Sequence, residues 1–138
     1  MGKKLIQLGD ERMAKLKTFF ANQPDILAVY LFGSYGTEFQ TPDSDVDFAV
    51  LFSPGAKIDL MAEMSLLGRM SMILGEDRLD LVNLNIVPLR LQYKVISTGR
   101  LIYEQDYIQT CDFVEEVFLR YQDYGIDRFF LIRNTIKH

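Results

Sequence analysis

Residues 31–52 read LFGSYGTEFQTPDSDVDFAVLF, and this stretch determines the fold expected for the chain. It continues an apolar run that begins at Ile26, so residues 26–32 are predicted to form a buried strand. A polar loop with Pro42 follows. Residues 45–52 then alternate between polar and apolar side chains, which is typical of a second strand with one face in the core. The predicted domain is therefore built around two strands and the polar loop that joins them.

The polar residues of this stretch are of the types that bind phosphate and divalent cations. Gly33 lacks the Cβ that would keep a phosphate from the backbone, and Ser34 adds a hydroxyl and an N–H at a predicted helix N-terminus. Asp45 and Asp47 lie two residues apart on the predicted second strand, so their carboxylates point to the same side. Their Cα atoms are expected roughly 6.5–7 Å apart. Such carboxylates can bridge magnesium ions that are about 3.5–4 Å apart.

A third acidic residue, Asp80, lies in residues 79–82, an apolar segment that predicts another short strand. A charge at a strand edge is the simpler explanation of Asp80, but a two-metal site leaves a place for a third carboxylate. Taken singly, a Gly-Ser turn or an Asp-x-Asp strand is weak evidence of function, whereas the combination is much more specific. It predicts phosphoryl or nucleotidyl transfer, which depends on positioning and on neutralising phosphate charge.

The rest of the chain predicts mainly helices. Asp10 is the expected N-cap of a helix over residues 11–21, and Gly75 is the expected C-terminal cap of a helix over residues 57–74. The predicted helices cover residues 11–21, 35–39, 57–74 and 88–97. Residues 101–104 predict a short edge strand, and a long helical pattern that Gly125 interrupts begins at residue 106. The aromatic and basic residues of 120–138 fit a partner interface and packing on the chain's own sheet equally well.

The expected fold class is α/β: a small mixed twisted sheet with helices mostly on one face and a C-terminal helical segment. The 138 residues suffice for one domain, with a core over 1–104 and the helical segment over 105–138. A composition that is 49% hydrophobic and 12% aromatic argues against disorder. We expect no membrane span, because no apolar stretch approaches roughly 20 residues, and no secretory signal at the N-terminus.

Charge and rare residues exclude several classes of protein. The net charge of −4 opposes stable binding to nucleic acid, whose phosphates attract basic surfaces. Cys111 is the single cysteine, so an internal disulfide is excluded and a reducing cytoplasm is predicted; we expect its side chain to be packed. His138 is the single histidine, which argues against a histidine-based zinc site or catalytic triad. The methionines of residues 57–74 are interpreted as core packing rather than as an adaptable binding surface.

Gly33-Ser34, ten intervening residues, Asp45-x-Asp47 and the later Asp80 resemble the signature of the DNA polymerase beta nucleotidyltransferase superfamily. The short chain and its tail resemble the minimal branch, the MNT-type nucleotidyltransferases. The resemblance implies that Gly33 and Ser34 bind the nucleotide, with Ser34 contacting the phosphates of ATP. It implies that Asp45 and Asp47 bind Mg²⁺. Asp80 would complete the metal site and help to deprotonate the acceptor hydroxyl.

Many members of that branch are antitoxins paired with HEPN-domain ribonuclease toxins, and they resemble enzymes that move AMP from ATP onto a toxin tyrosine. The resemblance thus implies an adenylyltransferase antitoxin with a HEPN toxin as partner. The chain is too short for a second substrate domain, which also favours an acceptor on another protein. Two alternatives remain: an antitoxin that neutralises by binding alone, and an enzyme that modifies an aminoglycoside. No residue indicates which nucleotide base is preferred.

Overall fold

Four strands form one mixed sheet in the computed structural model, which describes residues 6–136 and the side chains of residues 6–123. The strands are β1 (Ile26–Phe32), β2 (Val46–Phe52), β3 (Leu79–Asn83) and β4 (Arg100–Glu104). Their order across the sheet is β3-β2-β1-β4. β1 is antiparallel to β2 and to β4, whereas β3 is parallel to β2. The predicted mixed sheet is confirmed, and β4 lies at its edge as expected.

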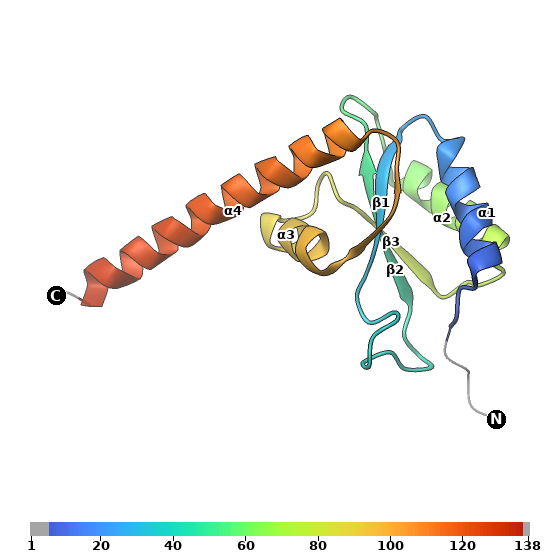
Figure 1. The fold of residues 1–138 in the computed structure, drawn as a ribbon, viewed down its shortest axis with the longest axis horizontal. Coiled ribbons are helices and arrows are strands. Elements are labelled where there is room, and N and C mark those ends of the chain that lie inside the picture. The colour runs from blue at the N-terminus through green and yellow to red at the C-terminus, as the bar shows by residue number, and fades with distance from the viewer. Residues whose placement is uncertain (1–5, 137–138) are drawn as a thin grey trace.

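Helices cover both faces of this sheet (Figure 1). They are α1 (Asp10–Ala21), α2 (Leu60–Leu74), α3 (Leu89–Thr98) and α4 (Tyr107–Ile136). α1 and α2 pack on one face, where Phe20, Met70 and Phe48 share a core cluster. α3 and the first part of α4 pack on the other, where Val95 and Phe113 meet Leu51. The prediction that the helices lie mostly on one face is wrong, because the central strands are apolar on both sides and need cover on each.

Residues 35–39 form turns instead of the predicted short helix. The N–H of Thr37 donates to the carbonyl of Ser34 at 3.0 Å, and the N–H of Gln40 donates to the carbonyl of Thr37 at 3.2 Å. Gly36 has a φ of +76°, a left-handed conformation that does not continue a right-handed helix. Ser34 therefore lies in a turn and not at a helix N-terminus.

Of the two predicted helix caps, Gly75 is confirmed and Asp10 is not. Gly9 is the N-cap of α1, and Asp10 is the first helical residue, where its charge suits the positive end of the helix dipole. α2 begins three residues later than expected because the carboxylate of Asp59 accepts a hydrogen bond from the N–H of Ala62 at 2.8 Å. Gly75, with a φ of +64°, caps the end of α2 as predicted.

α4 runs for 30 residues through Gly125, so the predicted interruption is wrong. A glycine within a helix costs about 1 kcal/mol relative to alanine but does not forbid the helix. The ring of Tyr93 on α3 stacks on Tyr121 at 3.7 Å between centroids and meets Phe118 edge-on at 5.3 Å. Tyr121 thus packs on its own domain. The other aromatic residues of the tail lie outside the described side chains.

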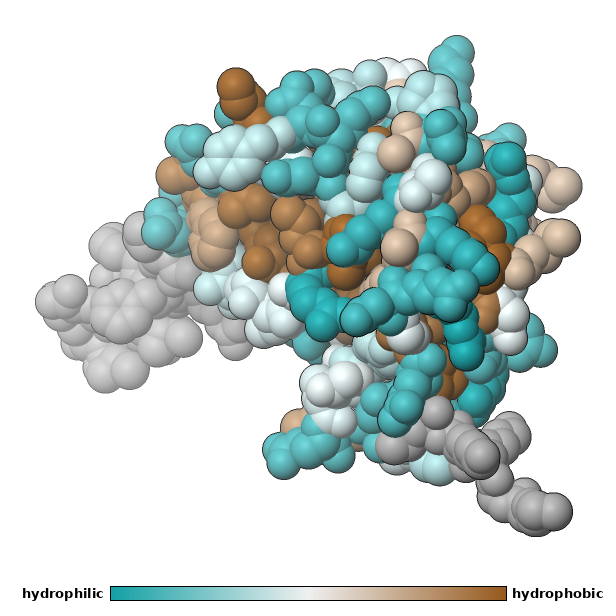
Figure 2. Space-filling model, turned by 45° about the vertical axis from the view of Figure 1, so that its right-hand side comes forward, coloured by the Kyte–Doolittle hydropathy of each residue, from teal (hydrophilic) through white to brown (hydrophobic). Residues whose placement is uncertain are grey.

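Several side chains expected in the core are exposed. Met70 is fully buried, but Met61 and Met72 are 74% and 84% exposed, so the core interpretation holds for only part of the methionine set. Cys111 is also exposed, contrary to expectation. Figure 2 shows a group of apolar side chains gathered left of centre on one face of the molecule, with smaller groups among hydrophilic side chains elsewhere. Among residues 6–136, no helix is both long and apolar enough to cross a membrane.

Candidate active site

The predicted site residues meet at one edge of the sheet. β1 ends at Phe32, directly before Gly33, and Phe32 pairs with Asp47 near the start of the antiparallel β2. β3 runs parallel to β2 and pairs Asp80 with Asp47. Neighbouring strands lie about 4.8 Å apart. The Gly33 turn and the two aspartates therefore come from three adjacent strands, although Asp80 lies far from the others in the sequence.

Asp47 is the carboxylate most affected by its surroundings. It is half-buried, whereas Asp45 and Asp80 are exposed. Burial raises the pKa of Asp47, and the negative charges of Asp80 and Asp45 raise it further. Asp80 and Asp45 are thus each close enough to Asp47 to repel its charge. A bound cation would relieve this repulsion and favour the ionised form of Asp47.

Gly33 lies in the turn after β1 and against this carboxylate. Its φ of +81° is a conformation that side chains with a Cβ rarely adopt. An ideal Cβ at this position would lie 2.3 Å from Oδ2 of Asp47, which is far inside van der Waals contact. Glycine is therefore favoured at position 33 for two reasons: the backbone has a positive φ, and the carboxylate of Asp47 occupies the space that a Cβ would need. The turn and the carboxylate lie against each other for that reason.

The turn of residues 33–36, hereafter the 33–36 turn, presents hydrogen-bond donors that have no acceptor. Among residues 6–136, nothing accepts a hydrogen bond from the main-chain N–H groups of Ser34 and Tyr35 or from the Ser34 hydroxyl. The carbonyl of Ser34 is engaged instead, since it accepts from the hydroxyl of Thr37 at 2.6 Å. Successive free N–H groups in a tight turn form an anion-binding site. This geometry replaces the helix N-terminus that the sequence predicted there.

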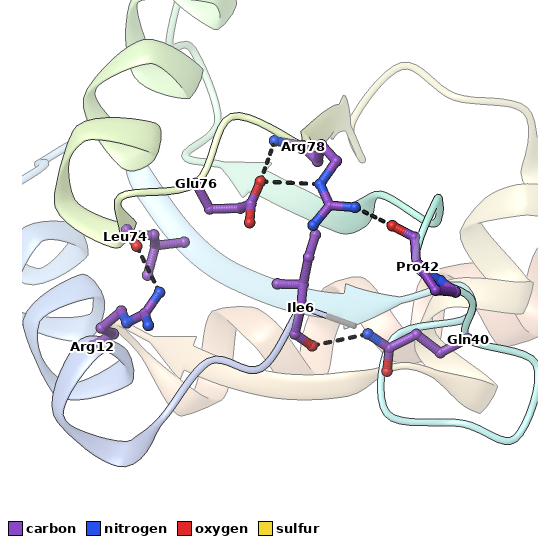
Figure 3. A network of polar contacts seen from close by, with 7 residues as sticks. All are labelled: Ile6, Arg12, Gln40, Pro42, Leu74, Glu76 and Arg78. Atoms are coloured by element: carbon purple, nitrogen blue, oxygen red, sulfur yellow. Dashed lines mark hydrogen bonds and ion pairs between the residues drawn. The ribbon is translucent and has the colours of Figure 1, made fainter. Parts of the chain in front are cut away.

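The loop between the turn and β2 is anchored to the body of the domain, as Figure 3 shows. Gln40 donates to the carbonyl of Ile6 at 2.9 Å, and the guanidinium of Arg78 donates to the carbonyl of Pro42. Arg78 also forms an ion pair with Glu76, with Nε of Arg78 3.3 Å from Oε1 of Glu76. The main-chain N–H of Arg78 donates to the same carboxylate, and this hydrogen bond is the largest of the effects that lower the pKa of Glu76. Arg78 directly precedes β3. Arg78 therefore links the loop that precedes Asp45 to the start of β3, which carries Asp80. The sequence analysis missed this role.

The donor set suits magnesium more than a transition metal, because it consists of hard oxygen ligands. Among residues 6–136, no three His, Cys, Asp or Glu side chains form a group that could hold a metal ion by themselves. Mg²⁺ usually takes only one or two carboxylates from the protein and completes its shell with water and substrate phosphates. Asp45 and Asp47 fit that pattern. Metal binding by Asp80 stays a prediction; its Oδ1 accepts from the N–H of Leu81 at 2.9 Å.

Two hollows differ in their relation to this site. The larger, of about 450 Å³, is lined by Phe52 and Asn85, at the end of β2 remote from Asp47. That is roughly 16 Å along the strand, so size alone does not identify the site. The smaller, of about 210 Å³, lies beside the 33–36 turn and is also lined by Arg100. Sequence reasoning missed Arg100, because only the pairing of β4 with β1 brings it to the turn.

A family model described as "Polymerase beta, Nucleotidyltransferase" matches residues 14–108. The chain belongs to this nucleotidyltransferase family. It is similar to the protein adenylyltransferase MntA of Shewanella oneidensis, with 32% identity over 97 residues. That match covers 70% of this chain and 66% of the relative, so the chain spans just under two thirds of the length of MntA.

Solved structures extend this likeness over nearly the whole chain. A structure described as a toxin-antitoxin with AMP-PNP is 27% identical, has a TM-score of 0.69 and is matched over 94% of this chain and 99% of its own. A second is described as a tri-AMPylated Shewanella oneidensis HEPN toxin in complex with an MNT antitoxin. It is 25% identical, with a TM-score of 0.63, and is matched over 91% and 97% of the two chains. These matches confirm the predicted nucleotidyltransferase fold.

Proposed function

We propose that this chain is a magnesium-dependent adenylyltransferase that moves AMP from ATP to a hydroxyl, on a tyrosine, of a HEPN-type toxin and thereby acts as its antitoxin. The observation that carries the proposal is the strand register, which places Asp47 beside Asp80 and against Gly33 of the phosphate-binding turn. The similarity to MntA, an adenylyltransferase, and to structures with AMP-PNP and with an AMPylated toxin supports the choice of ATP and of the partner.

The chemistry follows from the residues at the sheet edge. The free N–H groups of the 33–36 turn and the hydroxyl of Ser34 bind the phosphates and orient the α-phosphorus. The acceptor oxygen attacks this phosphorus in line, the bond to the α–β bridging oxygen breaks, and pyrophosphate leaves. Asp80, exposed beside the site, accepts the proton of the acceptor hydroxyl. Magnesium held by Asp45 and Asp47 would neutralise phosphate charge and activate the attacking oxygen.

The test combines the purified protein with the proposed HEPN-type partner and with magnesium and ATP. Intact-mass spectrometry of the partner should show a gain in steps of one AMP. In Asp45→Asn and Asp47→Asn the rate should fall by at least about 100-fold while the fold stays intact, because the metal ligands are lost. Asp25→Asn is the matched control, since Asp25 is an exposed aspartate at the other end of β1. Wild-type turnover in either site variant would refute the metal role.

The same experiment separates the alternatives. If the aspartate variants form a stable complex with the toxin and still neutralise it in cells, the chain acts by binding alone. If neither mass gain nor complex appears, a small acceptor such as an aminoglycoside becomes the better proposal. The free donors of the 33–36 turn favour the enzyme, because an antitoxin that only binds has no need of an anion site there. A cytoplasmic location and the absence of stable nucleic-acid binding remain predictions.

A further inference from the structure

Arg100 lies at the same sheet edge as the residues of the candidate site. β4 begins at Arg100 and is antiparallel to β1, so that Arg100 pairs with Leu31. The strand order β3-β2-β1-β4 therefore places Asp80, Asp47, the 33–36 turn and Arg100 in succession along one edge. With strands about 4.8 Å apart, the backbone of Arg100 is roughly 10 Å from that of Asp47. The turn lies between them.

The hollow of about 210 Å³ connects Arg100 with this turn. Gly33, Thr37 and Thr98 line it together with Arg100. The two threonine hydroxyls already donate their protons, Thr37 to the carbonyl of Ser34 and Thr98 to the carbonyl of Lys94, each at 2.6 Å. The guanidinium of Arg100 is thus the charged donor of this hollow. Gly33 lines the hollow and also lies against Asp47, so the hollow and the carboxylates are on two sides of one turn.

The charge of Arg100 is not used within the described part of the chain. Among residues 6–136 it forms no ion pair and no side-chain hydrogen bond. Arg78, which also lies at this edge, is engaged with Glu76 and Pro42. A guanidinium offers donors in a fork that matches phosphate oxygens, and it stays charged at any physiological pH. A protein of net charge −4 with three aspartates at this edge would otherwise repel a polyphosphate.

We propose that Arg100 binds the terminal phosphates of the nucleotide, beyond the 33–36 turn that holds the inner ones, so that the site selects triphosphates over monophosphates. This inference rests on the proposed function and names a further binding residue for it. The metal-binding aspartates lie at one end of the row, and the unpaired cation lies at the other. A polyphosphate chain that lies across the turn would reach the aspartates and their metal at one end and Arg100 at the other. The released pyrophosphate would then lie on the side of Arg100.

The experiment measures binding of ATP and of AMP, each with magnesium, to the full chain by calorimetry. Arg100→Ala should weaken ATP binding by about 10–100-fold, the loss expected for a hydrogen bond between charged groups, and should change AMP binding less than about twofold. Arg100→Lys keeps the charge but loses the forked donors, so its affinity for ATP should lie between those of the wild type and Arg100→Ala. In turnover with the partner, Arg100→Ala should raise the KM for ATP more than it lowers kcat.

Arg90→Ala is the matched control, because Arg90 is equally an exposed arginine but lies at the start of α3, away from the turn. It should bind both nucleotides as the wild type does. Equal ATP affinity in Arg100→Ala and wild type would overturn the role of Arg100 and leave the proposed function standing. Equal losses for ATP and AMP would also overturn it. A wild-type chain that neither binds ATP nor transfers AMP would remove both proposals. Melting curves of each variant test whether it is folded, and Arg100→Lys provides the comparison if Arg100→Ala is not.

Discussion

Gly33 and Asp47 constrain each other sterically. The carboxylate of Asp47 occupies the space where a Cβ of residue 33 would be, and the chain turns there with a positive φ. The turn proposed to bind phosphate and the carboxylate proposed to bind metal are therefore held at a set separation. Binding groups that are positioned in advance lose little freedom when the substrate arrives, which is how this kind of site accelerates a reaction.

Two glycine variants should separate the backbone effect from the contact with Asp47. A Cβ added at Gly36 would meet no atom within 4 Å. Gly36→Ala should therefore reduce the free energy of unfolding only by the cost of alanine at a positive φ, about 1 kcal/mol. Gly33→Ala has the same backbone cost and also displaces Asp47, so we expect a loss of about 2–3 kcal/mol. AMP transfer should fall strongly in Gly33→Ala alone. Urea unfolding and turnover test this, and equal losses of stability in both variants would contradict it.

The raised pKa of Asp47 implies that the metal-free site destabilises the fold at neutral pH. Because the folded protein favours protonated Asp47, the free energy of unfolding should decrease as pH rises through the range where this group ionises. Because solvent screens this half-exposed carboxylate, Asp47→Asn should increase stability at pH 7 by less than about 1 kcal/mol, and it should flatten that part of the pH profile. Thermal melting with a chelator present measures both. An unchanged profile in Asp47→Asn, matching that of Asp25→Asn, would count against it.

Among the secondary structure elements, α3 and α4 depend on each other through aromatic rings. Tyr93 on α3 is the shared partner of Phe118 and Tyr121 on α4. This cluster joins α3 to α4, and Figure 1 shows α4 extending well beyond the sheet. α3 also ends at Thr98, in the hollow beside the 33–36 turn. The same helix pair therefore supports the site and directs the C-terminal segment.

A double-mutant cycle should measure this contact. Tyr93→Ala and Tyr121→Ala should each destabilise the protein, and the coupling energy between them should be about 0.5–1.5 kcal/mol, because their rings stack in parallel at 3.7 Å. Urea unfolding of the wild type, both single variants and the double variant gives the coupling. Strictly additive losses would mean that the stacking adds nothing beyond burial of each ring.

Across the entire domain, the site depends on all four strands, because each contributes one end to the same edge. Ligand binding at that edge should therefore stabilise the cooperative fold and not only a loop. Magnesium together with ATP at 100 times the Kd should add about 2.7 kcal/mol to the free energy of unfolding, which raises the Tm by several degrees. ATP with a chelator should raise the Tm less. Asp45→Asn should lose most of the increase, and an undiminished rise in that variant would contradict a metal-bridged nucleotide.

Local patterns in the chain were sufficient to predict the strands and to select the residue types of the candidate site. β1 spans the predicted residues, and β2 and β3 differ from prediction by one residue at one end. Gly33, Asp45 and Asp47 could be selected from sequence, because residue type and a spacing of two along a strand are local properties. The α/β class followed from the same alternation of apolar and polar residues.

Long-range pairing produced the rest of the site. The parallel register of β3 with β2 brings Asp80 beside Asp47, and the pairing of β4 with β1 brings Arg100 to the 33–36 turn. No periodicity in the chain encodes which strands become neighbours. Helix cover on both faces was missed for a related reason, because it depends on which segments pack on each side of the sheet. The turns at residues 35–39 and the uninterrupted α4 were missed for a local reason, because a single glycine is only a weak indicator of where a helix begins, ends or continues.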